Sequence, residues 1–421
     1  MASCGIPHRV VVQTLRTVNR SCSVLTRLSD STIRAFHPSQ TCSRPYCFRQ
    51  QLCHHHDYRL TRRHAISGAR SSPWCSTHLE RPVSTSSTLL AEATVNPLTD
   101  TDPFKLAADE VKDLRADICK VLEANEPKMQ EMAQYYFSRG KMFRPMVCML
   151  MSKLCNNQNN MGDSVLPSQR IIAMVMEMLH SASLIHDDVV DAADERRNMK
   201  SLNMIYGQRR SILAGNFIHT QASKIISSIG NSRVIALHAT AVEDIISGEF
   251  LQLHTKEDES ERFKLYMKKT HKKTASPLAC YNKCVAILSN VDETLIDAAY
   301  SYGYNFGMSY QIIDDVLDFV GQEKMGKPTD SDLKMGMVNA PVLFAAMECQ
   351  DLHPVIMRRF SEPGDVEYAR DMIKKTSALD RTRDLAAEHI EQAIRSLDHF
   401  TPCPARDALA QVPLILSRRK V

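Results

Sequence analysis

The spacing of apolar residues constrains this chain more than any other feature. From residue 106 onward, apolar residues recur three and four positions apart, which is the period of an α-helix and not the alternation of a half-buried strand. The pattern is clearest at 106–122, 171–185 and 298–317, and we find no convincing alternating stretch. Clusters of turn-forming residues separate the helical stretches, at 156–160, 162–167, 230–231, 289–292, 321–328 and 363–364. The sequence therefore predicts an all-α fold of about ten or more helices.

The first 79 residues differ from the rest of the chain in charge. They contain 11 Arg, no Lys and only two acids, Asp30 and Asp57, which gives a net charge of +9. Removing them from the 52 basic and 48 acidic residues of the whole chain leaves 41 and 46, a net charge of −5. An Arg-rich, Ser-rich and acid-poor N-terminus is typical of a mitochondrial transit peptide, with a disordered basic tail as the alternative. We expect residues 1–90 to be a largely unstructured transit peptide and linker, and residues 91–421 to be the catalytic domain.

The composition of the chain argues against three kinds of protein. Because residues 80–421 are net acidic, no general attraction to nucleic acid is expected. No apolar run is long enough for a transmembrane segment. Six of the 13 Cys lie in the first 79 residues and the other seven are scattered, so a disulfide framework is not predicted.

Two Asp-rich clusters lie late in long apolar helical stretches. Their members are Asp187, Asp188 and Asp191 in the first cluster and, 127 positions later, Asp314, Asp315 and Asp318 in the second. Positions i and i+4 share one face of a helix, so each cluster crowds carboxylates that repel one another unless cations bridge them. Oxygen ligands that leave room for water and phosphate suit Mg²⁺. One cluster alone could be a solvated acidic face, but two in apolar frames predict facing helices that clamp a metal-bound diphosphate.

Basic residues balance these acids. Lys141 and Arg144 lie three positions apart, Arg196 and Arg197 follow the first cluster, and Lys272, Lys273 and Lys327 come later. Any one of them is more often a surface charge. Together with the acids, they predict a site for two polyanionic substrates, one held through metal and one held directly by Lys and Arg.

The ordered set of motifs resembles that of the all-trans polyprenyl diphosphate synthases. The motifs are GKxxRP at 140–145, ExxHxASLxHDDxxD at 177–191 with two arginines after it, KTA at 273–275, and QxxDDxxDF at 311–319 followed by GKP at 326–328. The resemblance covers about residues 100–421. Within the family, the stretches at 140–145, 248–253 and 357–360 and the leader most resemble the catalytic subunits of animal mitochondrial decaprenyl and solanesyl diphosphate synthases.

The resemblance implies a fold, an activity and a set of partners. The fold is the isoprenoid-synthase helical bundle around a central cavity. The activity is that of a prenyltransferase that condenses an allylic diphosphate with successive isopentenyl diphosphates, to make decaprenyl or nonaprenyl diphosphate for the side chain of ubiquinone. It implies a hetero-oligomer with a related non-catalytic second subunit, in the mitochondrial matrix or on the matrix face of the inner membrane, with peripheral membrane contact at product release.

The resemblance also implies a role for each motif residue. Mg²⁺, three ions with diphosphate bound, is expected at Asp187, Asp188, Asp191, Asp314, Asp315 and Asp318. Isopentenyl diphosphate is expected at Lys141, Arg144, His180 and Arg197. The allylic diphosphate is expected at Arg196, Lys273 and Lys327. The catalytic residues are expected to be Lys273, Thr274 and Gln311, with Thr274 and Gln311 lining the reacting carbons.

Product length is expected to depend on the helix before the first cluster. A growing tail that runs back along this helix first meets the residues four and five positions before Asp187, which are Ser183 and Ala182. Small residues there leave the path open, whereas Phe or Tyr would close it, although small residues also simply permit helix packing. The two residues favour a long product over farnesyl diphosphate.

Several residues depart from the family pattern or have a structural alternative. Asn216, Ala192 and Asn198 replace the usual Asp, Asp and Gly, and none of them is an expected metal ligand. Pro277 follows the KTA motif in a helical stretch, where an interior Pro costs about 3 kcal/mol and kinks the helix, so we expect it to displace Lys273 slightly. His186 is expected to be a hydrogen-bonded core residue and not a ligand.

Three other functions remain open on sequence alone: a shorter-chain geranylgeranyl synthase, a class I terpene cyclase and a non-catalytic helical subunit. The site of Lys141 and Arg144 argues against a cyclase, which has no isopentenyl substrate. Six intact Asp residues argue against a non-catalytic subunit.

Overall fold

The structure is a computed structural model that describes residues 101–123, 126–138, 140–197, 199–252, 259–320 and 330–418. All of these belong to one unit, Pro82–Val421. The expected transit peptide, Lys327 and Asn198 lie outside the described residues.

The described residues are almost entirely helical, as the apolar spacing predicts. The first half of the unit contains α3 (Pro103–Leu106), α4 (Ala108–Lys112), α5 (Leu114–Val121), α6 (Pro127–Phe137), α7 (Phe143–Gln158), α8 (Pro167–Val190), α9 (Leu202–Tyr206), α10 (Gln208–Ser227) and α11 (Ser232–Gln252). The second half contains α12 (Glu259–Thr270), the π-helical turn η2 (His271–Ala275), α13 (Ser276–Leu288), α14 (Glu293–Val320), α15 (Ser331–Lys334), α16 (Ala340–Glu348), α17 (Leu352–Met357), α18 (Asp365–Lys375), α19 (Ala378–Ser396), the 3₁₀ turn η3 (Leu397–His399) and α20 (Pro404–Ser417).

The ends of the helices follow local sequence signals. Asp102 caps α3 by accepting a hydrogen bond from the Phe104 backbone N–H at 2.9 Å. Pro occupies the first turn of α3, α6, α8 and α20, where its missing N–H leaves no helical hydrogen bond unmade. The described turn clusters fall between helices as expected, for example at 289–292 between α13 and α14.

One small feature was not predicted. β1 (Glu195–Arg196) and β2 (Met199–Lys200) form a two-stranded antiparallel ladder directly after the first Asp cluster. Strands of two residues are too short to show an alternating pattern, so the sequence gives no signal for them.

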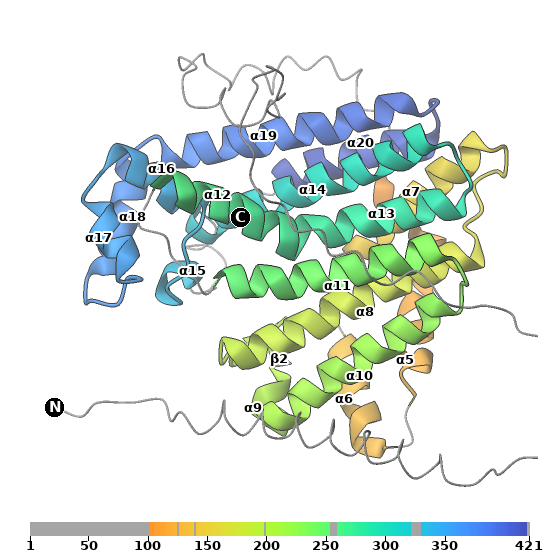
Figure 1. Ribbon diagram of the computed structural model, residues 1–421, viewed down its shortest axis with the longest axis horizontal. Coiled ribbons are helices and arrows are strands. Elements are labelled where there is room, and N and C mark those ends of the chain that lie inside the picture. The colour runs from red at the N-terminus through yellow and green to blue at the C-terminus, as the bar shows by residue number, and fades with distance from the viewer. Residues whose placement is uncertain are drawn as a thin grey trace, which may run out of the picture. The chain divides into compact units, whose positions relative to one another are not determined.

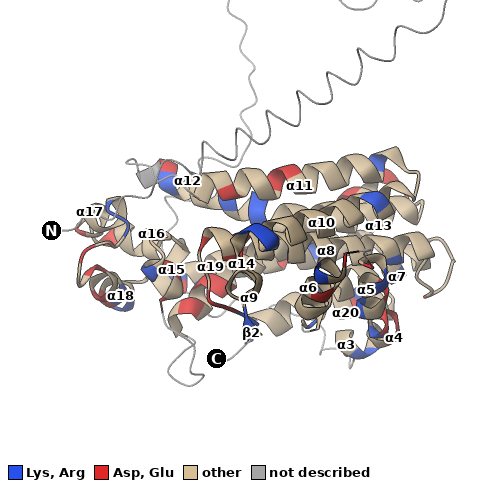
Figure 2. Ribbon diagram, turned by 90° about the horizontal axis from the view of Figure 1, so that it is seen from below, with Lys and Arg blue, Asp and Glu red and all other residues tan. Residues whose placement is uncertain are grey.

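The long helices lie side by side in a bundle. Helices α11, α13 and α14 occupy the middle, α8 and α10 lie on one side, and α19 and α20 on the other (Figure 1). Helices α8, α11 and α14 run in the same direction, so their C-terminal ends lie at one end of the bundle, on the left in Figure 1. In the view of Figure 2, acidic and basic segments are interspersed over the helices.

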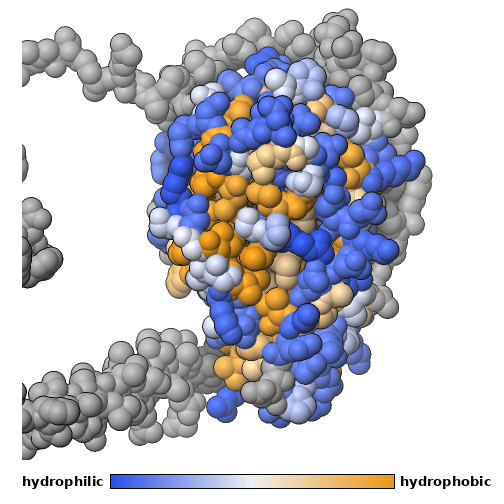
Figure 3. All heavy atoms as spheres, turned by 90° about the vertical axis from the view of Figure 1, so that its right-hand side faces the viewer, coloured by the Kyte–Doolittle hydropathy of each residue, from blue (hydrophilic) through white to orange (hydrophobic). Residues whose placement is uncertain are grey.

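The interior of the bundle is apolar. Its largest fully buried side chains include Tyr281, Tyr302, Phe137 and Phe306, and burial of each stabilises the fold by roughly 1.5–3 kcal/mol. A second, smaller hydrophobic cluster joins α12 to the short helices α16–α18. Figure 3 shows that one end of the unit carries hydrophobic residues surrounded by hydrophilic ones. Among the described residues, no helix has the length and apolar character needed to cross a membrane.

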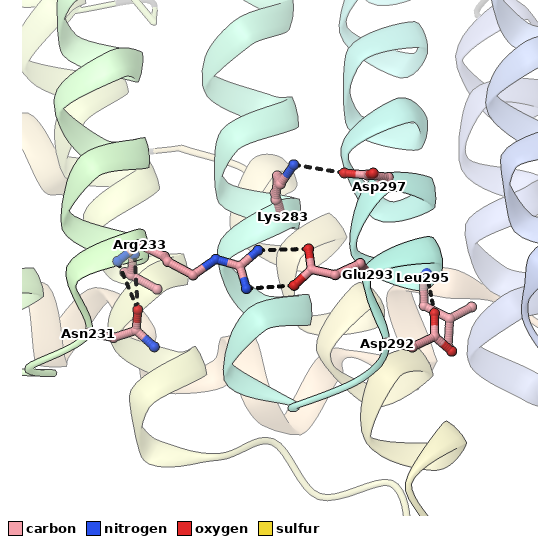
Figure 4. A network of polar contacts seen from close by, with 8 residues as sticks. Asn231, Arg233, Lys283, Asp292, Glu293, Leu295 and Asp297 are labelled. Atoms are coloured by element: carbon pink, nitrogen blue, oxygen red, sulfur yellow. Dashed lines mark hydrogen bonds and ion pairs between the residues drawn. The ribbon is translucent and has the colours of Figure 1, made fainter.

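A polar network joins α11, α13 and α14 at the end of the bundle opposite the Asp clusters. Arg233 on α11 forms two hydrogen bonds with the Glu293 carboxylate on α14, of 2.7 and 2.8 Å, and Lys283 on α13 pairs with Asp297 on α14 at 2.8 Å (Figure 4). The Arg233 and Glu293 side chains are more than half exposed on average, so we expect the pair to stabilise the fold by less than about 1 kcal/mol.

Candidate active site

The C-terminal ends of α8, α11 and α14 create an electronegative site. Asp187 and Asp188 lie in the last turn of α8, Glu249 in the last turn of α11, and Asp314 and Asp315 in the last two turns of α14. Each helix end adds a partial negative charge of about half an electron. Carboxylates and helix dipoles therefore act together, and the site favours cations.

Lys273 is the central cation of this site. Its ammonium group lies 3.3 Å from the Asp187 carboxylate, 2.5 Å from the Glu249 carboxylate and 3.3 Å from the side-chain carbonyl of Gln252. Burial alone would lower the pKa of Lys273, but the charges of Asp187 and Glu249 outweigh it and raise the pKa. Burial raises the pKa of Asp187 to about 6, against the opposing charge of Lys273. The expected residues Asp187 and Lys273 are thus in direct contact.

Asp188 is held by Arg196. The guanidinium of Arg196 contacts one carboxylate oxygen, Oδ1, through its Nε at 2.7 Å and Nη2 at 2.6 Å. The other oxygen, Oδ2, is buried and has no hydrogen-bond partner among the described residues. Asp191 is the C-cap of α8 and is exposed. Burial raises the pKa of Asp188.

Asp315 is saturated with hydrogen bonds. Its Oδ1 accepts one from the Gln311 amide at 3.0 Å, and its Oδ2 accepts one from the Tyr266 hydroxyl at 2.8 Å and one from the Ala340 backbone N–H at 3.3 Å. The side chain is buried, and burial raises its pKa. The same Gln311 accepts a hydrogen bond from the Thr274 hydroxyl at 3.0 Å. A chain of hydrogen bonds therefore links Thr274 and Gln311, both expected site residues, to Asp315.

Asp318 of the second cluster faces the segment before α16. Asp318 accepts hydrogen bonds from the Ser331 hydroxyl at 2.7 Å and from the Asp332 backbone N–H at 3.3 Å. Asp332 accepts one from the Asn339 amide at 3.1 Å. Burial and the neighbouring charges of Asp315 and Asp318 raise the pKa of Asp332 to about 7. Asp332 is thus a further acid at this site, and the sequence offered no motif for it.

The π-helical turn η2 positions the KTA motif. The turn is held between two glycines: a Cβ on Gly248 of α11 would lie 3.0 Å from the Lys273 backbone nitrogen, and a Cβ on Gly307 of α14 would lie 2.5 Å from the Ala275 Cα. Only residues without a side chain allow these helices to approach so closely. A π-turn within a helix is often found at a functional site.

Pro277 does not kink a helix interior in the structure, contrary to the expectation from the sequence. Pro277 lies in the first turn of α13, directly after η2, where its missing N–H is tolerated. The wide π-turn absorbs the irregularity, and Lys273 keeps its contacts with Asp187 and Glu249. In a continuous α-helix this Pro would be an interior residue, but the π-helical turn η2 ends directly before α13 and places Pro277 in a first turn.

The residues expected to bind isopentenyl diphosphate gather around α7 and α8. The Arg144 guanidinium lies 2.9 Å from His180 Nε2 and 5.3 Å from the centre of the Tyr310 ring. Arg197 pairs with Glu177 at 3.5 Å and lies 5.3 Å from the centre of the Tyr136 ring. Burial, followed by the positive charges of Arg144, Arg197 and Arg196, lowers the pKa of His180 well below its usual range, so this imidazole is neutral.

Lys141 lies in the loop before α7 and is exposed. It is the one member of the expected isopentenyl set for which we find no contact with another described side chain. Because no residue that the structure describes pairs with it, the ammonium group of Lys141 would be available to a ligand.

The remaining predicted positions lie along α8 and α10. Ala182 is buried at 2% exposure and Ser183 is half-buried, with its hydroxyl bonded to the His180 carbonyl. The His186 imidazole lies 3.3 Å from the Ile212 carbonyl on α10, in agreement with a structural role. Asn216 is exposed on α10, and Ala192 adopts a left-handed backbone conformation with φ 51°.

Besides Asp332, four other residues of the site were not singled out from the sequence. Glu249 and Gln252 pair with Lys273, Glu177 pairs with Arg197, and Tyr266 holds Asp315. Glu177, Glu249 and Gln252 lie within motifs that carried the family resemblance, so the signal was present. Tyr266 lies in no motif, and only its hydrogen bond from α12 to Asp315 on α14 reveals it.

The site can accept divalent metal, although its carboxylates do not form a closed cage. Among the described residues, no three His, Cys, Asp or Glu side chains converge as a ready-made metal site. Mg²⁺ is usually bound by one or two carboxylates together with water and substrate phosphates, so an open arrangement fits it. The unpartnered Oδ2 of buried Asp188 is a free oxygen ligand.

Comparison with known proteins identifies the family. The family model of polyprenyl synthetase matches residues 126–373, more than half of the chain. The chain belongs to the polyprenyl synthetase family. It is therefore a prenyltransferase.

Its relatives are long-chain enzymes. An all trans-polyprenyl-diphosphate synthase of Homo sapiens is 45% identical over 76% of this chain and 78% of its own length. Solanesyl-diphosphate synthase 1, mitochondrial, of Oryza sativa is 38% identical over 73% and 75%, and decaprenyl-diphosphate synthase subunit 1 of Schizosaccharomyces pombe is 37% identical over 76% and 93%. The chain is a long-chain all-trans polyprenyl diphosphate synthase.

Solved structures confirm the fold. A decaprenyl diphosphate synthase from Rhodobacter capsulatus matches with a TM-score of 0.69 and 25% identity, over 75% of this chain and 97% of that one. A polyprenyl synthase from Caulobacter crescentus, complexed with calcium and isoprenyl diphosphate, matches with a TM-score of 0.69 and 27% identity, over 76% and 97%. The predicted all-α bundle of the isoprenoid synthases is confirmed.

Proposed function

We propose that this enzyme elongates an allylic diphosphate with successive isopentenyl diphosphates, at the site between α8, α11 and α14, to make the decaprenyl or nonaprenyl precursor of the ubiquinone side chain. The observation that carries the proposal is the position of Lys273. One ammonium group bridges the first Asp cluster and α11, and the neighbouring Thr274 is bonded to Gln311 beside the second cluster. The two clusters thus serve one site.

The metal ions belong to the allylic half of this site. Asp187, Asp188 and Asp191 would hold Mg²⁺ from α8, and Asp314 and Asp318 from α14, with three ions per bound diphosphate. Asp315 belongs to the same metal site but would act mainly by fixing the others, since both of its oxygens already accept hydrogen bonds. Mg²⁺, when bound, supplies the positive charge that stabilises the departing pyrophosphate.

The protein's own side chains orient the reactants. Arg196, Lys273 and Lys327 would bind the allylic diphosphate, and the bond between its first carbon and the diphosphate oxygen breaks. The isopentenyl double bond forms the new carbon–carbon bond at that carbon, and a proton then leaves to the released pyrophosphate. Thr274 and Gln311, hydrogen-bonded at 3.0 Å, would present fixed dipoles to the developing allylic cation. Catalysis is therefore mainly positional and electrostatic.

Isopentenyl diphosphate would be held without metal. Arg144, Arg197 and Lys141 supply fixed positive charge, and the neutral His180 supplies a hydrogen-bonding group beside Arg144. The aromatic faces of Tyr310 and Tyr136 hold the two guanidinium groups in place. A preorganised cluster of this kind suits a dianionic ligand.

The length of the product would depend on α8. Ala182 and Ser183 lie on the helix that ends in the first cluster, about one and a half turns before Asp187. Their small side chains would let a growing tail pass along α8, which fits the long-chain relatives.

The remaining proposals concern the leader and the partner. Residues 1–90 would direct the chain to the mitochondrion, since several relatives are named as mitochondrial enzymes, and residues 91–421 would form the catalytic domain. The activity would be exerted in the matrix or at the matrix face of the inner membrane. The relative from Schizosaccharomyces pombe is named as a subunit, and we propose that this chain works with a related second subunit that lacks its own site.

A product assay tests the proposal. The chain, alone and together with the candidate second subunit, is incubated with an allylic diphosphate, labelled isopentenyl diphosphate and Mg²⁺, and the dephosphorylated prenols are separated by chromatography. We expect prenols of nine or ten isoprene units that disappear when Mg²⁺ is chelated. The absence of any prenol from both samples in the presence of Mg²⁺ would contradict the proposed function.

A further inference from the structure

The loop that carries Lys141 has an irregular backbone. Gly140 has a φ of 139° and Met142, the N-cap of α7, has a φ of 48°. Both values lie in the region of positive φ that side chains disfavour. A loop of this kind needs contacts from outside to hold one conformation.

Arg115 on α5 supplies such contacts. Its guanidinium donates a hydrogen bond of 2.7 Å to the Gly140 carbonyl and one of 3.4 Å to the Ser138 carbonyl, at the end of α6. A charged donor forms a stronger hydrogen bond than a neutral one. The Arg115 guanidinium thus holds the backbone just before Lys141 by bonding to the carbonyls of both Ser138 and Gly140.

The helix that carries Arg115 is fixed to the bundle. Arg170 on α8 donates two hydrogen bonds to the Asp117 carboxylate on α5, of 2.9 and 2.6 Å, and a third to the Glu110 carbonyl on α4 at 2.6 Å. Arg115 and Asp117 are two residues apart. The position of Arg115 is therefore tied to α8, the helix that also carries His180 and the first Asp cluster.

The other side of the loop lies against Arg197. A Cβ on Gly140 would lie 2.9 Å from Arg197 Nη1, so the backbone at this residue packs directly against that guanidinium. Arg197 is in turn paired with Glu177, which is buried at 3% exposure. The loop is thus held between Arg115 on one side and an expected ligand of isopentenyl diphosphate on the other.

We infer that Arg115 is a positioning residue for the isopentenyl diphosphate subsite: it fixes the Gly140–Met142 loop so that Lys141 faces the ligand that Arg197 binds. Arg115 itself donates to protein carbonyls and does not contact substrate. The inference rests on the proposed function, because it assigns a role within the site proposed there.

Steady-state kinetics with each substrate varied in turn test this role. We expect Arg115→Ala to raise KM for isopentenyl diphosphate about tenfold, as the loss of roughly one charged hydrogen bond of positioning energy would do, and to leave KM for the allylic diphosphate within about twofold. Arg115→Lys, which replaces the fork by a single ammonium group, should give an intermediate KM for isopentenyl diphosphate. Arg233→Ala is the matched control, because it removes an Arg that also makes two hydrogen bonds, but far from the site (Figure 4).

A double-mutant cycle separates positioning from general damage. If Arg115 acts through the loop, the variant with both Arg115→Ala and Lys141→Ala should raise KM for isopentenyl diphosphate no more than about twofold beyond Lys141→Ala alone. Effects of the two substitutions that multiply, or an equal rise of KM for both substrates, would overturn the inference. If Arg115→Ala does not fold, the same cycle is measured with Arg115→Lys.

The outcomes distinguish this inference from the proposed function. An unchanged KM for isopentenyl diphosphate in Arg115→Ala, with an active wild-type enzyme, contradicts only the role of Arg115. A wild-type enzyme and an Arg233→Ala variant that both fail to make prenols contradict the function itself.

Discussion

The close contact between Gly307 and the π-turn predicts that a single methyl group there damages catalysis. In Gly307→Ala, the new Cβ would lie 2.5 Å from the Ala275 Cα and 3.1 Å from the Ala275 Cβ, whereas ordinary contacts are 3.4–4 Å. The nearest atom, the Ala275 Cα, belongs to the backbone and cannot rotate away. α14 and η2 must therefore separate by about 1 Å, a typical effect of overpacking.

The separation acts on the site directly. The 3.0 Å hydrogen bond between Thr274 and Gln311 joins the two elements, and an added 1 Å would break it. We expect a loss of about 1–3 kcal/mol in the free energy of unfolding and a fall in kcat of about 100-fold, because a misplacement of about 1 Å has that effect on an oriented reaction.

Gly303→Ala is the matched control. A Cβ on Gly303, one turn earlier on α14, would lie 2.6 Å from the Leu278 carbonyl and 2.8 Å from the Ala279 Cα, so it overpacks the same helix by a similar amount, but against α13 and not against η2. We expect a similar loss of stability and a fall in kcat below about tenfold. Urea unfolding and prenol production are measured on both variants. An equal kcat in the two variants, at equal stability, would refute the role assigned to the π-turn.

Three further perturbations test other parts of the site. Ala182→Phe should shift the prenol chromatogram to shorter products, whereas Ala222→Phe, at an equally buried position on α10, should leave product length unchanged; an identical shift in both variants would count against a tail path along α8. Arg196→Gln should raise KM for the allylic diphosphate, because it removes the partner of Asp188, and should leave KM for isopentenyl diphosphate nearly constant. A rise of KM for isopentenyl diphosphate alone would show that Arg196 belongs to the isopentenyl subsite and not to the allylic one. Burial raises the pKa of Asp187 from its ordinary value of 3.8 to about 6, so the folded metal-free chain binds this proton more tightly than the unfolded chain does. The free energy of unfolding of wild type, relative to that of Asp187→Asn, should therefore fall as pH rises from 4 through 6, by at most about 3 kcal/mol. Urea unfolding at each pH without Mg²⁺ measures this difference, and a flat difference between pH 4 and 7 would show that the Asp187 proton is not linked to folding.

Much of the fold follows from the sequence because helical periodicity is a local signal. The apolar positions at 171–185 and 298–317 fall within α8 and α14, and Asp102-Pro103 marks the start of α3. The spacing of the Asp clusters likewise places each near the end of its helix. These features depend only on residues that are close in the chain.

The features that were not predicted depend on contacts between distant segments. The π-turn at 271–275 exists where Gly248 and Gly307, far apart in sequence, both approach it, and no local pattern reveals that. Pro277 was misjudged for the same reason, since its effect depends on the turn before it. Tyr266 and Arg115 act on Asp315 and Gly140 across 49 and 25 positions, and neither lies in a motif. Sequence patterns identified the residues expected to meet substrate, but not those that hold them in place.

The central claim is that the two Asp clusters bind one metal-diphosphate between α8 and α14. Crystals of the enzyme grown with Mn²⁺ in place of Mg²⁺ and with a non-reactive allylic thiodiphosphate would test it most directly, because anomalous scattering locates the metal ions. We expect Mn²⁺ next to Asp187 and Asp191 and next to Asp314, with the diphosphate between the ions and Lys273 in contact with it. Mn²⁺ at only one of the two clusters, or a diphosphate bound away from both, would contradict it.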